Sequence, residues 1–259
     1  MQKSIKRIAI AGSGNIAWHL VKGLKSQNYE LTGICSRDYS NALTLARSCG
    51  SNACMEVSAL CEETDLIIIA VADNAIKEVA LRIGKFEGIV VHTAGSVSID
   101  VLKDTFKNYG VFYPLQTFSK GTPVDLNEVS FFLESSDDKV YNVLKQVALS
   151  LSSKVYEADS QQRMSLHVAA VFAGNYSNLM YVIGNEILKN TGLPKEVLHT
   201  LILETARKAI ASDPLTMQTG PARRKDTITI EKHIETLASF PEYAELYRLL
   251  ANLISNKYK

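Results

Sequence analysis

The first strand of this chain runs directly into a glycine turn and then into a helix. The stretch reads Arg7-Ile8-Ala9-Ile10-Ala11-Gly12-Ser13-Gly14-Asn15-Ile16-Ala17. Gly12 permits a tight turn, Gly14 lets the backbone approach a phosphate, and Ala17 lets the helix pack against the strand. The start of that helix presents free N–H groups and the positive end of its dipole to an anion. This order of elements is what a dinucleotide pyrophosphate requires.

Two further elements complete a β-α-β unit. Residues 18–24 continue the helix with an apolar face, and residues 29–35 are predicted to form a second strand. Glycine triplets also close ordinary strand-helix loops, but the complete unit favours dinucleotide binding. We therefore predict that the dinucleotide contacts Gly12, Ser13, Gly14, Asn15 and Ile16.

The residues after the second strand indicate which dinucleotide binds. Ser36 and Arg37 stand where NAD-preferring folds place an acidic residue that receives the ribose hydroxyls. Arg37 can supply a cation and Ser36 a hydrogen bond to a 2′-phosphate, so we predict NADP as the cofactor. The alternative is that Arg37 and Asp38 form only a solvated turn with a weak surface ion pair.

The composition limits the classes of partner. The 259 residues are 46% hydrophobic and 21% charged, enough for a sizeable core and two domains. A formal net charge of +1 gives no electrostatic case for nucleic acid or an anionic membrane surface. No apolar run approaches the roughly twenty residues of a membrane span. We expect a soluble, cytoplasmic protein that binds a small-molecule substrate.

The cysteines do not indicate a metal site. The four residues are Cys35, Cys49, Cys54 and Cys61. They include no Cys-x-x-Cys pair, and no histidine stands at ligand spacing, so we expect free thiols and no metal.

An alternation of strands and helices continues past the opening unit and then stops. Further strands are predicted at residues 65–71, 88–93, 109–113, 130–133 and 154–156, and helices at 41–48, 75–83, 99–106 and 138–151. From Asp159 onward only helices are predicted, at about 160–190, 194–212, 227–239 and 242–256. This pattern predicts an α/β fold, with a Rossmann-like, mostly parallel, NADP-binding domain (residues 1–155) followed by an all-helical substrate and dimerisation domain (residues 156–259).

The carboxyl ends of the predicted strands should line a cleft between these domains, where cofactor and substrate meet. Ala70, Val71 and Ala72, at the end of one buried strand and the start of its loop, are predicted cofactor contacts, and the small side chains of Ala70 and Ala72 leave room for the cofactor. Asp73, which follows, is expected to cap the next helix.

Two later strands end in polar residues. His92 and Ser96 follow the strand that should end beside the nicotinamide, where a histidine can exchange a proton and a hydroxyl can bind a polar substrate. The alternative is a buried histidine bonded to backbone and a serine that caps a helix. Gln116, after the next strand, is a candidate for the substrate pocket, although a structural turn with Phe118 in the core explains this loop almost as well.

The helical region supplies three more candidates. His167 and Asn175 are eight positions apart, so in a regular α-helix both can face the cleft, with His167 as a general acid and Asn175 as a substrate anchor. A histidine on an otherwise apolar helix face is as often a satisfied interior group. Arg224, in an irregular loop after Thr219-Gly220-Pro221, can clamp a carboxylate or a phosphate.

Taken together, these segments resemble a known two-part family. They are Gly-Ser-Gly-Asn-Ile-Ala, His-Thr-Ala-Gly-Ser, Tyr-Pro-Leu-Gln-Thr-Phe, His167 with Asn175-Tyr176, and Thr-Gly-Pro-Ala-Arg-Arg-Lys-Asp. They resemble the family that joins a Rossmann-like domain to the helical domain DUF2520, over nearly the whole chain. The resemblance implies an NADP-dependent oxidoreductase, distantly similar to pyrroline-5-carboxylate reductase, coenzyme F420-dependent NADP reductase and the β-hydroxyacid dehydrogenases.

Three positions depart from these families. Tyr113 stands where the family commonly has His before Pro, so the resemblance transfers no catalytic role to it. Lys225 stands where the family commonly has Gly. Val171 stands where the β-hydroxyacid dehydrogenases have a Lys four residues before a helical Asn, so their lysine mechanism does not transfer.

These observations support two hypotheses. The first is an oxidoreductase that transfers a hydride between NADP(H) and a small polar carbonyl or imine, with His167 as the preferred acid and His92 as the second. Asn175, Ser96 and Arg224 would position the substrate. The second is a non-catalytic NADP-binding sensor or interaction protein. Coenzyme F420 as hydride partner is weaker, since no residue pattern indicates a deazaflavin site. Related reductases associate through the helical domain, which implies a homodimer.

Overall fold

The chain, described by a computed structural model over residues 5–189 and 191–258, divides into two compact units. The first is Met1–Gly174 and the second is Asn175–Lys259. The boundary predicted after residue 155 lies at the last strand, whereas this division falls inside the long helix that follows. Each unit is described below by itself.

The first unit is built on one eight-stranded sheet with the order β3-β2-β1-β4-β5-β6-β7-β8. Strands β1 to β6 run parallel, β7 pairs antiparallel with β6, and β8 pairs parallel with β7. The strands are β1 (Arg7–Ala11), β2 (Glu30–Cys35), β3 (Asn52–Cys54), β4 (Leu66–Ile69), β5 (Ile89–His92), β6 (Asn108–Leu115), β7 (Ser130–Ser135) and β8 (Val155–Glu157). The predicted α/β class with a mostly parallel sheet is confirmed.

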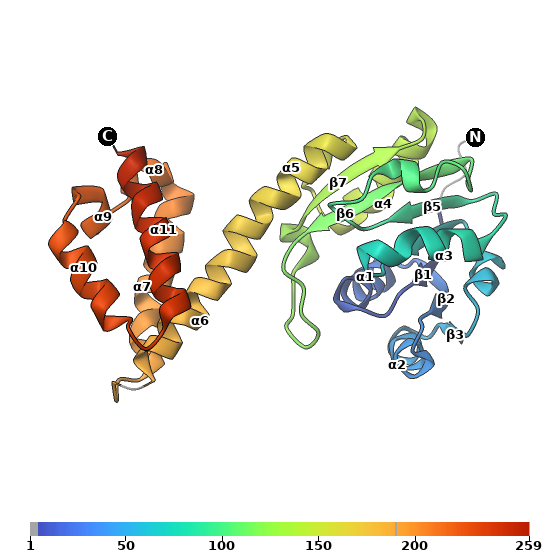
Figure 1. Cartoon of the computed structure of the whole chain (residues 1–259). Coiled ribbons are helices and arrows are strands. Elements are labelled where there is room, and N and C mark those ends of the chain that lie inside the picture. The colour runs from blue at the N-terminus through green and yellow to red at the C-terminus, as the bar shows by residue number, and fades with distance from the viewer. Residues whose placement is uncertain (1–4, 190, 259) are drawn as a thin grey trace. The chain divides into compact units, whose positions relative to one another are not determined.

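Helices cover both faces of this sheet (Figure 1). On one face Leu20, Leu45 and Leu144 bring three helices into one apolar core, and on the other Leu60 and Ile76 belong to a second core. The helices of the first face are α1 (Asn15–Ser26), α2 (Tyr39–Cys49) and α4 (Asp138–Leu151), and those of the second are α3 (Ile76–Ile83) and the 3-10 turns η1 (Val57–Cys61) and η3 (Ile99–Val101). Because β4 is enclosed by both cores, all four of its residues are fully buried.

The order of the strands reverses at β1, which lies between β2 and β4. The Gly12 N–H donates to the Cys35 carbonyl at 2.7 Å, and the Ala70 N–H donates to the Ala11 carbonyl at 2.7 Å. The carboxyl ends of β1, β2 and β4 are thereby held together. In open α/β sheets this position is where a crevice for ligands forms.

A long helix begins after β8 with a capping box. The Asp159 carboxylate accepts the Gln162 N–H at 2.8 Å, and the Gln162 side chain accepts the Asp159 N–H at 3.0 Å. The predicted start of this helix is confirmed. It runs as α5 (Ser160–Ala170), a π-helical turn (Val171–Tyr176) and α6 (Ser177–Leu188). The expectation that regular α-helical spacing relates His167 to Asn175 is wrong, because Asn175 lies within the π-helical turn.

One predicted helix is wrong. Residues 99–106 form only the 3-10 turn η3 followed by further turns. The N–H groups of Leu102, Lys103 and Thr105 each donate three residues back, which tightens the backbone beyond an α-helix. Leu102 and Phe106 still reach the core, so the apolar spacing was read correctly but the backbone was not.

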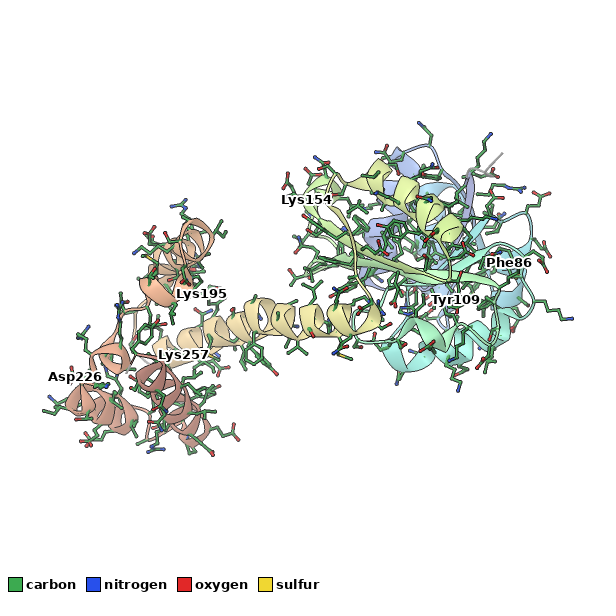
Figure 2. The ribbon with its side chains drawn as sticks, turned by 90° about the horizontal axis from the view of Figure 1, so that it is seen from above. Phe86, Tyr109, Lys154, Lys195, Asp226 and Lys257 are labelled. Atoms are coloured by element: carbon green, nitrogen blue, oxygen red, sulfur yellow. The ribbon has the colours of Figure 1, made fainter. Side chains whose placement is uncertain are left out.

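All the described elements of the second unit are helices, and Figure 2 shows its side chains, with Lys195 at the start of η6, Asp226 before α10 and Lys257 at the end of α11. Besides α6 it holds η6 (Lys195–Leu198), α7 (His199–Ala211), α8 (Pro214–Met217), α9 (Pro221–Arg224), α10 (Thr227–Thr236) and α11 (Pro241–Lys257). The short helices α8 and α9 were not predicted, although each begins with a proline. No helix in the described part of the chain has the length and apolar character that crossing a membrane requires.

The backbone explains why the family commonly has glycine where this chain has Lys225. Lys225 ends α9 in the left-handed region, with φ of 56°. Glycine adopts that conformation without the steric cost that a side chain adds. The turn is nevertheless retained, because the Lys225 N–H donates to the Ala222 carbonyl at 3.2 Å and the Asp226 N–H to the Pro221 carbonyl at 3.0 Å.

Candidate functional site

The glycine turn after β1 has the shape that a dinucleotide requires. Gly12 has φ of 133°, and a Cβ atom there would lie 2.1 Å from the Ala70 carbonyl oxygen, so only glycine fits. At Gly14 a Cβ atom would meet nothing within 4 Å, so the space above the turn is open. Helix α1 begins at Asn15 without a side-chain cap from Gly14. Its N-terminus is therefore available to a phosphate.

The end of β2 is fastened to this turn. The Ser13 hydroxyl donates to the Ser36 hydroxyl at 2.8 Å, which brings two predicted cofactor residues together. Arg37 is exposed, and no described residue pairs with its guanidinium. The Asp38 carboxylate instead caps α2 and accepts the Ser40 hydroxyl at 2.6 Å. The alternative of an Arg37–Asp38 surface pair is wrong for the described residues.

The hydrogen bonds to Asp38 also change its acidity. The Ser40 hydroxyl, followed by the Asn41 N–H, lowers the pKa of the exposed Asp38 carboxyl, and the charge of Lys120 adds to the effect. Lys120 is therefore near the end of β2, which sequence reasoning missed. The cause is a hydrogen bond of 3.3 Å from the Lys120 N–H to the Asn15 side chain, which draws the loop after β6 toward α1.

The rest of this loop packs along α1. His19 bonds the Ser119 carbonyl at 3.1 Å, and its ring lies 5.0 Å from that of the buried Phe118. Gln116 is exposed, and its side-chain oxygen accepts the Thr117 N–H at 2.8 Å. Gln116 thus stays on the surface of the first unit as a candidate for contact with substrate.

The loop after β4 differs from its prediction at Asp73. Ala70 is buried, whereas Val71 is half-buried and Ala72 is exposed. Asp73 opens a 3-10 turn (η2, Asp73–Ala75) and caps neither that turn nor α3. Its carboxylate accepts a short hydrogen bond from the Ser96 hydroxyl. The expected helix-cap role of Asp73 is wrong, because the carboxylate crosses to the neighbouring strand end.

His92, the last residue of β5, is fully buried. Its Nδ1 accepts the Ala94 N–H at 3.2 Å, and its Nε2 has no hydrogen-bond partner among the described residues. Burial, and after it the Arg163 guanidinium, lowers the pKa of His92 to about 4. The imidazole is therefore neutral at physiological pH. This geometry matches the alternative of a buried histidine bonded to backbone, and a catalytic role for His92 stays a prediction.

Arg163, which sequence reasoning missed, fastens α5 to the loop after β5. Its guanidinium is fully buried and forms a short ion pair with Glu134 of β7. It also donates to the Val97 carbonyl at 2.6 Å and to the Ala94 carbonyl at 3.3 Å. The loop that carries Gly95 and Ser96 therefore cannot move independently of α5.

Ser160 extends the same network. Its N–H and its hydroxyl donate to the Glu134 carboxylate at 3.1 and 2.8 Å, and its hydroxyl accepts the Ile99 N–H at 3.1 Å. In sequence, Arg163 is one cation in the first turn of a helix, where cations are usually solvated. The approach of β7 and the loop after β5 gives it all its described partners except the Ser160 hydroxyl of its own helix.

Tyr113 and His167 meet above Gly95. The Tyr113 hydroxyl lies 3.2 Å from His167 Nδ1, and a Cβ atom at Gly95 would lie 2.8 Å from both side chains. Burial, and after it the Asp73 carboxylate, raises the pKa of Tyr113, while Arg163 opposes the shift. Tyr113 is therefore a protonated hydroxyl at physiological pH, held against the predicted acid.

Comparisons with known proteins agree with this geometry. Residues 7–101 match the family model described as NADP oxidoreductase, coenzyme F420-dependent, and residues 129–254 match the domain of unknown function DUF2520. A Bacteroides fragilis protein, provisionally described as an NADP oxidoreductase, is 39% identical, with 97% of this chain and 98% of that chain covered and a TM-score of 0.92. The chain belongs to this two-domain NADP oxidoreductase family.

More distant structures share the fold of the family. A reductive aminase from Aspergillus terreus, solved with NADPH and ethyl-5-oxohexanoate, has 15% identity and a TM-score of 0.75 over 98% of this chain and 93% of that one. A pyrroline-5-carboxylate reductase from Coxiella burnetii has 17% identity and a TM-score of 0.59 over 99% and 98%. No curated protein matches the chain.

Two predicted site residues of this family member lie in its second unit. Asn175 stands in the π turn as the first residue of that unit. Arg224 ends α9 and is exposed, and no described residue pairs with it. Its neighbour Arg223 instead donates to the Thr216 carbonyl at 3.2 Å, and its guanidinium lies 5.1 Å from the Tyr258 ring. The loop is thus held by Arg223 and presents Arg224.

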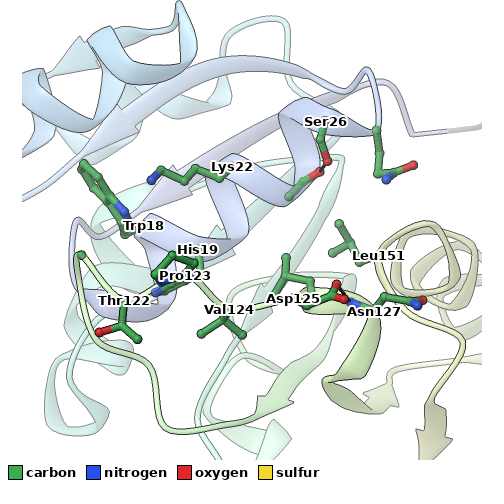
Figure 3. Close-up of a pocket in the computed structure, with 14 residues that line it drawn as sticks. Trp18, His19, Lys22, Ser26, Thr122, Pro123, Val124, Asp125, Asn127 and Leu151 are labelled. Atoms are coloured by element: carbon green, nitrogen blue, oxygen red, sulfur yellow. Dashed lines mark hydrogen bonds between the residues drawn. The ribbon is translucent and has the colours of Figure 1, made fainter.

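A separate hollow lies along the flank of α1 (Figure 3). Its volume is about 460 Å³, and it is lined by Trp18 and Lys22 of α1 and by the loop from Gly121 to Asn127. None of the predicted site residues lines it. Among the described residues, no three His, Cys, Asp or Glu side chains are arranged to hold a metal ion.

The Arg163–Glu134 pair yields a stability prediction. Arg163→Met should lower the free energy of unfolding by about 3–5 kcal/mol, because it leaves Glu134 and two carbonyls without their buried partner. Arg82→Met is the matched control, since Arg82 pairs with Glu56 at 3.0 Å on the surface and should cost less than about 1 kcal/mol. Urea unfolding measures both, and equal midpoint shifts for the two variants would contradict the role assigned to Arg163.

Proposed function

We propose that this protein transfers a hydride between NADP(H) and a small polar carbonyl or imine substrate. The observation that carries the proposal is the Tyr113–His167 hydrogen bond beside Gly95, in the same unit as the open glycine turn. The family membership and the reductases among the distant structures support it. When bound, NADPH would supply the hydride.

The residues around the glycine turn fit NADP. Gly12, Ser13, Gly14, Asn15 and Ile16 surround the open N-terminus of α1, where a pyrophosphate would bind. Ser36 and Arg37 would hold the 2′-phosphate, since Asp38 is engaged with α2 and leaves Arg37 unpaired among the described residues. Ala70, Val71 and Ala72 would form the wall beyond the pyrophosphate.

Tyr113 and His167 would together provide the proton when a carbonyl is reduced. A reduced carbonyl oxygen takes up a proton, and a hydroxyl with a raised pKa keeps its proton across the physiological range. His167 accepts or donates at Nδ1 and can replace the proton that Tyr113 gives up. The predicted acid His167 would therefore act through, or alongside, Tyr113, to which sequence reasoning assigned no role.

The remaining candidates would position the substrate. Ser96 presents a hydroxyl beside Gly95, and Gln116 presents an exposed amide after β6. Asn175 and Arg224 are proposed as further substrate ligands from the second unit. His92 would act by supporting the loop after β5, and substrate binding between the domains stays a prediction.

A non-catalytic NADP sensor is the second candidate. The neutral, enclosed His92 favours it, since one of the two predicted acids cannot reach a substrate. The Tyr113–His167 hydrogen bond favours the enzyme instead, because His167 is only half-buried and a binding protein has no need of a paired proton donor.

A homodimer formed through the second unit is also proposed. Of its described residues, only Ala222, Leu237, Ala244 and Ala251 are buried. Large apolar side chains are exposed, and Leu201 is 63% exposed. A unit with so small a core and so much apolar surface favours association with a second copy.

The 2′-phosphate assignment predicts a change in cofactor preference. Arg37→Ala should weaken NADPH binding about tenfold to a hundredfold, the loss expected for a charge-assisted hydrogen bond, and should leave NADH binding unchanged. Arg47→Ala, which removes an exposed cation from the last turn of α2, is the control. Fluorescence titration measures these affinities, and equal affinity of the unmodified protein for NADPH and NADH would refute the assignment.

The proton-donor assignment predicts the behaviour of two tyrosine variants. Tyr113→Phe should reduce the rate of carbonyl reduction about a hundredfold or more, as loss of a general acid does. Tyr109→Phe, at the other end of β6, should have little effect. Because the pKa of Tyr113 is raised, the rate should fall only above the ordinary tyrosine pKa of about 10. NADPH oxidation with a panel of ketones, imines and oxo acids measures this, with oxidised coenzyme F420 as a further hydride acceptor. Background rates throughout, despite tight NADPH binding, would favour the sensor.

The dimer proposal predicts the mass in solution. Light scattering should give twice the chain mass of 28.5 kDa, and Leu201→Glu should shift the population toward the single-chain mass. Lys232→Glu, a charge change on an exposed position of α10, should leave the dimer intact. A single-chain mass for the unmodified protein at micromolar concentration would refute the proposal.

A further inference from the structure

We infer that Asp73 selects a substrate with a positive charge at its reacting group, a protonated imine, over a neutral carbonyl of the same shape. This inference rests on the proposed hydride transfer and narrows its substrate class. It uses four side chains that the ends of neighbouring strands and α5 bring together in one unit: Asp73, Ser96, Tyr113 and His167.

The position of Asp73 is determined by its contact with the next strand end. Ser96 donates its hydroxyl proton to the Asp73 carboxylate. The adjacent residue, Gly95, has its Cα face against Tyr113 and His167, where a Cβ atom would come within 2.8 Å of both. The carboxylate and the proton-donating pair therefore both contact the dipeptide Gly95-Ser96.

The charges around this dipeptide leave Asp73 uncompensated. No described cationic side chain forms an ion pair with Asp73. Arg163 is the cation nearest to this loop in the hydrogen-bond network, and its charge is matched by Glu134. His92, at the start of the loop, is neutral because its pKa is lowered to about 4. One negative charge therefore remains at this edge of the sheet.

The field of Asp73 reaches the proton donor. Its carboxylate is the second cause, after burial, of the raised pKa of Tyr113. A charge that disfavours a tyrosinate at this position also disfavours the alkoxide that develops when a carbonyl is reduced. The same charge favours a cationic group bound in that place.

The reductions of a protonated imine and of a carbonyl differ in the charge at the reacting group, and Asp73 can distinguish the two substrates by this charge. In a protonated imine the incoming hydride forms the new C–H bond, the π pair of the C=N bond moves to nitrogen, and a neutral amine results without a further proton. In a carbonyl the π pair moves to oxygen, which must then take a proton from Tyr113. Asp73 would increase the protonated fraction and the binding of the imine, so its effect belongs in KM.

The test compares two rings of the same size, 1-pyrroline and cyclopentanone, as substrates for NADPH oxidation. Asp73→Asn should lower kcat/KM for 1-pyrroline by about tenfold or more relative to cyclopentanone, with most of the change in KM. Asp104→Asn is the control, since Asp104 is an exposed carboxylate near the amino end of β6. It should leave both values unchanged.

Two kinetic outcomes overturn the inference. In the first, Asp73→Asn lowers kcat/KM for both rings by the same factor. In the second, Asp73→Asn changes the ratio of the NADP⁺ and NADPH affinities by as much as it changes kcat/KM for 1-pyrroline. That result would place the carboxylate against the cofactor. Ser96→Ala provides an independent check, because release of Asp73 should reduce the preference for 1-pyrroline in the same direction.

A binding measurement separates this inference from the proposed function. Calorimetry of the NADP⁺-saturated protein with pyrrolidinium should show binding that Asp73→Asn weakens about tenfold, while cyclopentanol binding is unchanged. If neither ring is reduced by the unmodified protein, hydride transfer to these substrates fails, and pyrrolidinium binding that depends on Asp73 still supports the cation site. Pyrrolidinium binding that is equal in both proteins refutes it.

Discussion

The buried ion pair between Arg163 and Glu134 is the interaction on which the site depends. It joins three segments far apart in sequence: α5, the antiparallel strand β7 and the loop after β5. A buried guanidinium must satisfy its donors, and the Glu134 carboxylate, the Val97 and Ala94 carbonyls and the Ser160 hydroxyl accept them here. Because the loop carries Gly95 and Ser96 while α5 carries His167, the pair sets the geometry of the proposed chemistry without taking part in it.

The site has two regions that suit ligands of different charge. Around β1 and β2 the protein offers open backbone and exposed donors, which suit an anionic ligand. Around the ends of β4, β5 and β6 it offers a neutral proton donor and an unpaired carboxylate, which suit a substrate that is neutral or cationic. The two regions adjoin because β4 pairs with β1 on one side and with β5 on the other.

Much of the first unit followed from local pattern. The strand, the glycine turn and the start of α1 were predicted because the sequence shows two glycines between an apolar strand and a helix. Their steric roles, a tight turn at Gly12 and open space at Gly14, follow from that pattern. The start of α5 was predicted for a similar reason, since Asp159 caps the helix through a residue only three positions away. Asp73 was assigned wrongly because its partner Ser96 lies in the loop after another strand, and Arg163 was missed because all its acceptors but one are distant in sequence.

The sequence by itself determined the β-α-β unit, the glycine turn and the place of Ser36 and Arg37 at the end of β2, because each depends on contacts within a strand, a turn or a helix start. Only the tertiary structure decided that Tyr113 meets His167, that His92 is enclosed and neutral, and that Asp73 turns to Ser96. These properties come from the pairing of β4, β5 and β6 and from burial, which act between residues that no sequence spacing relates.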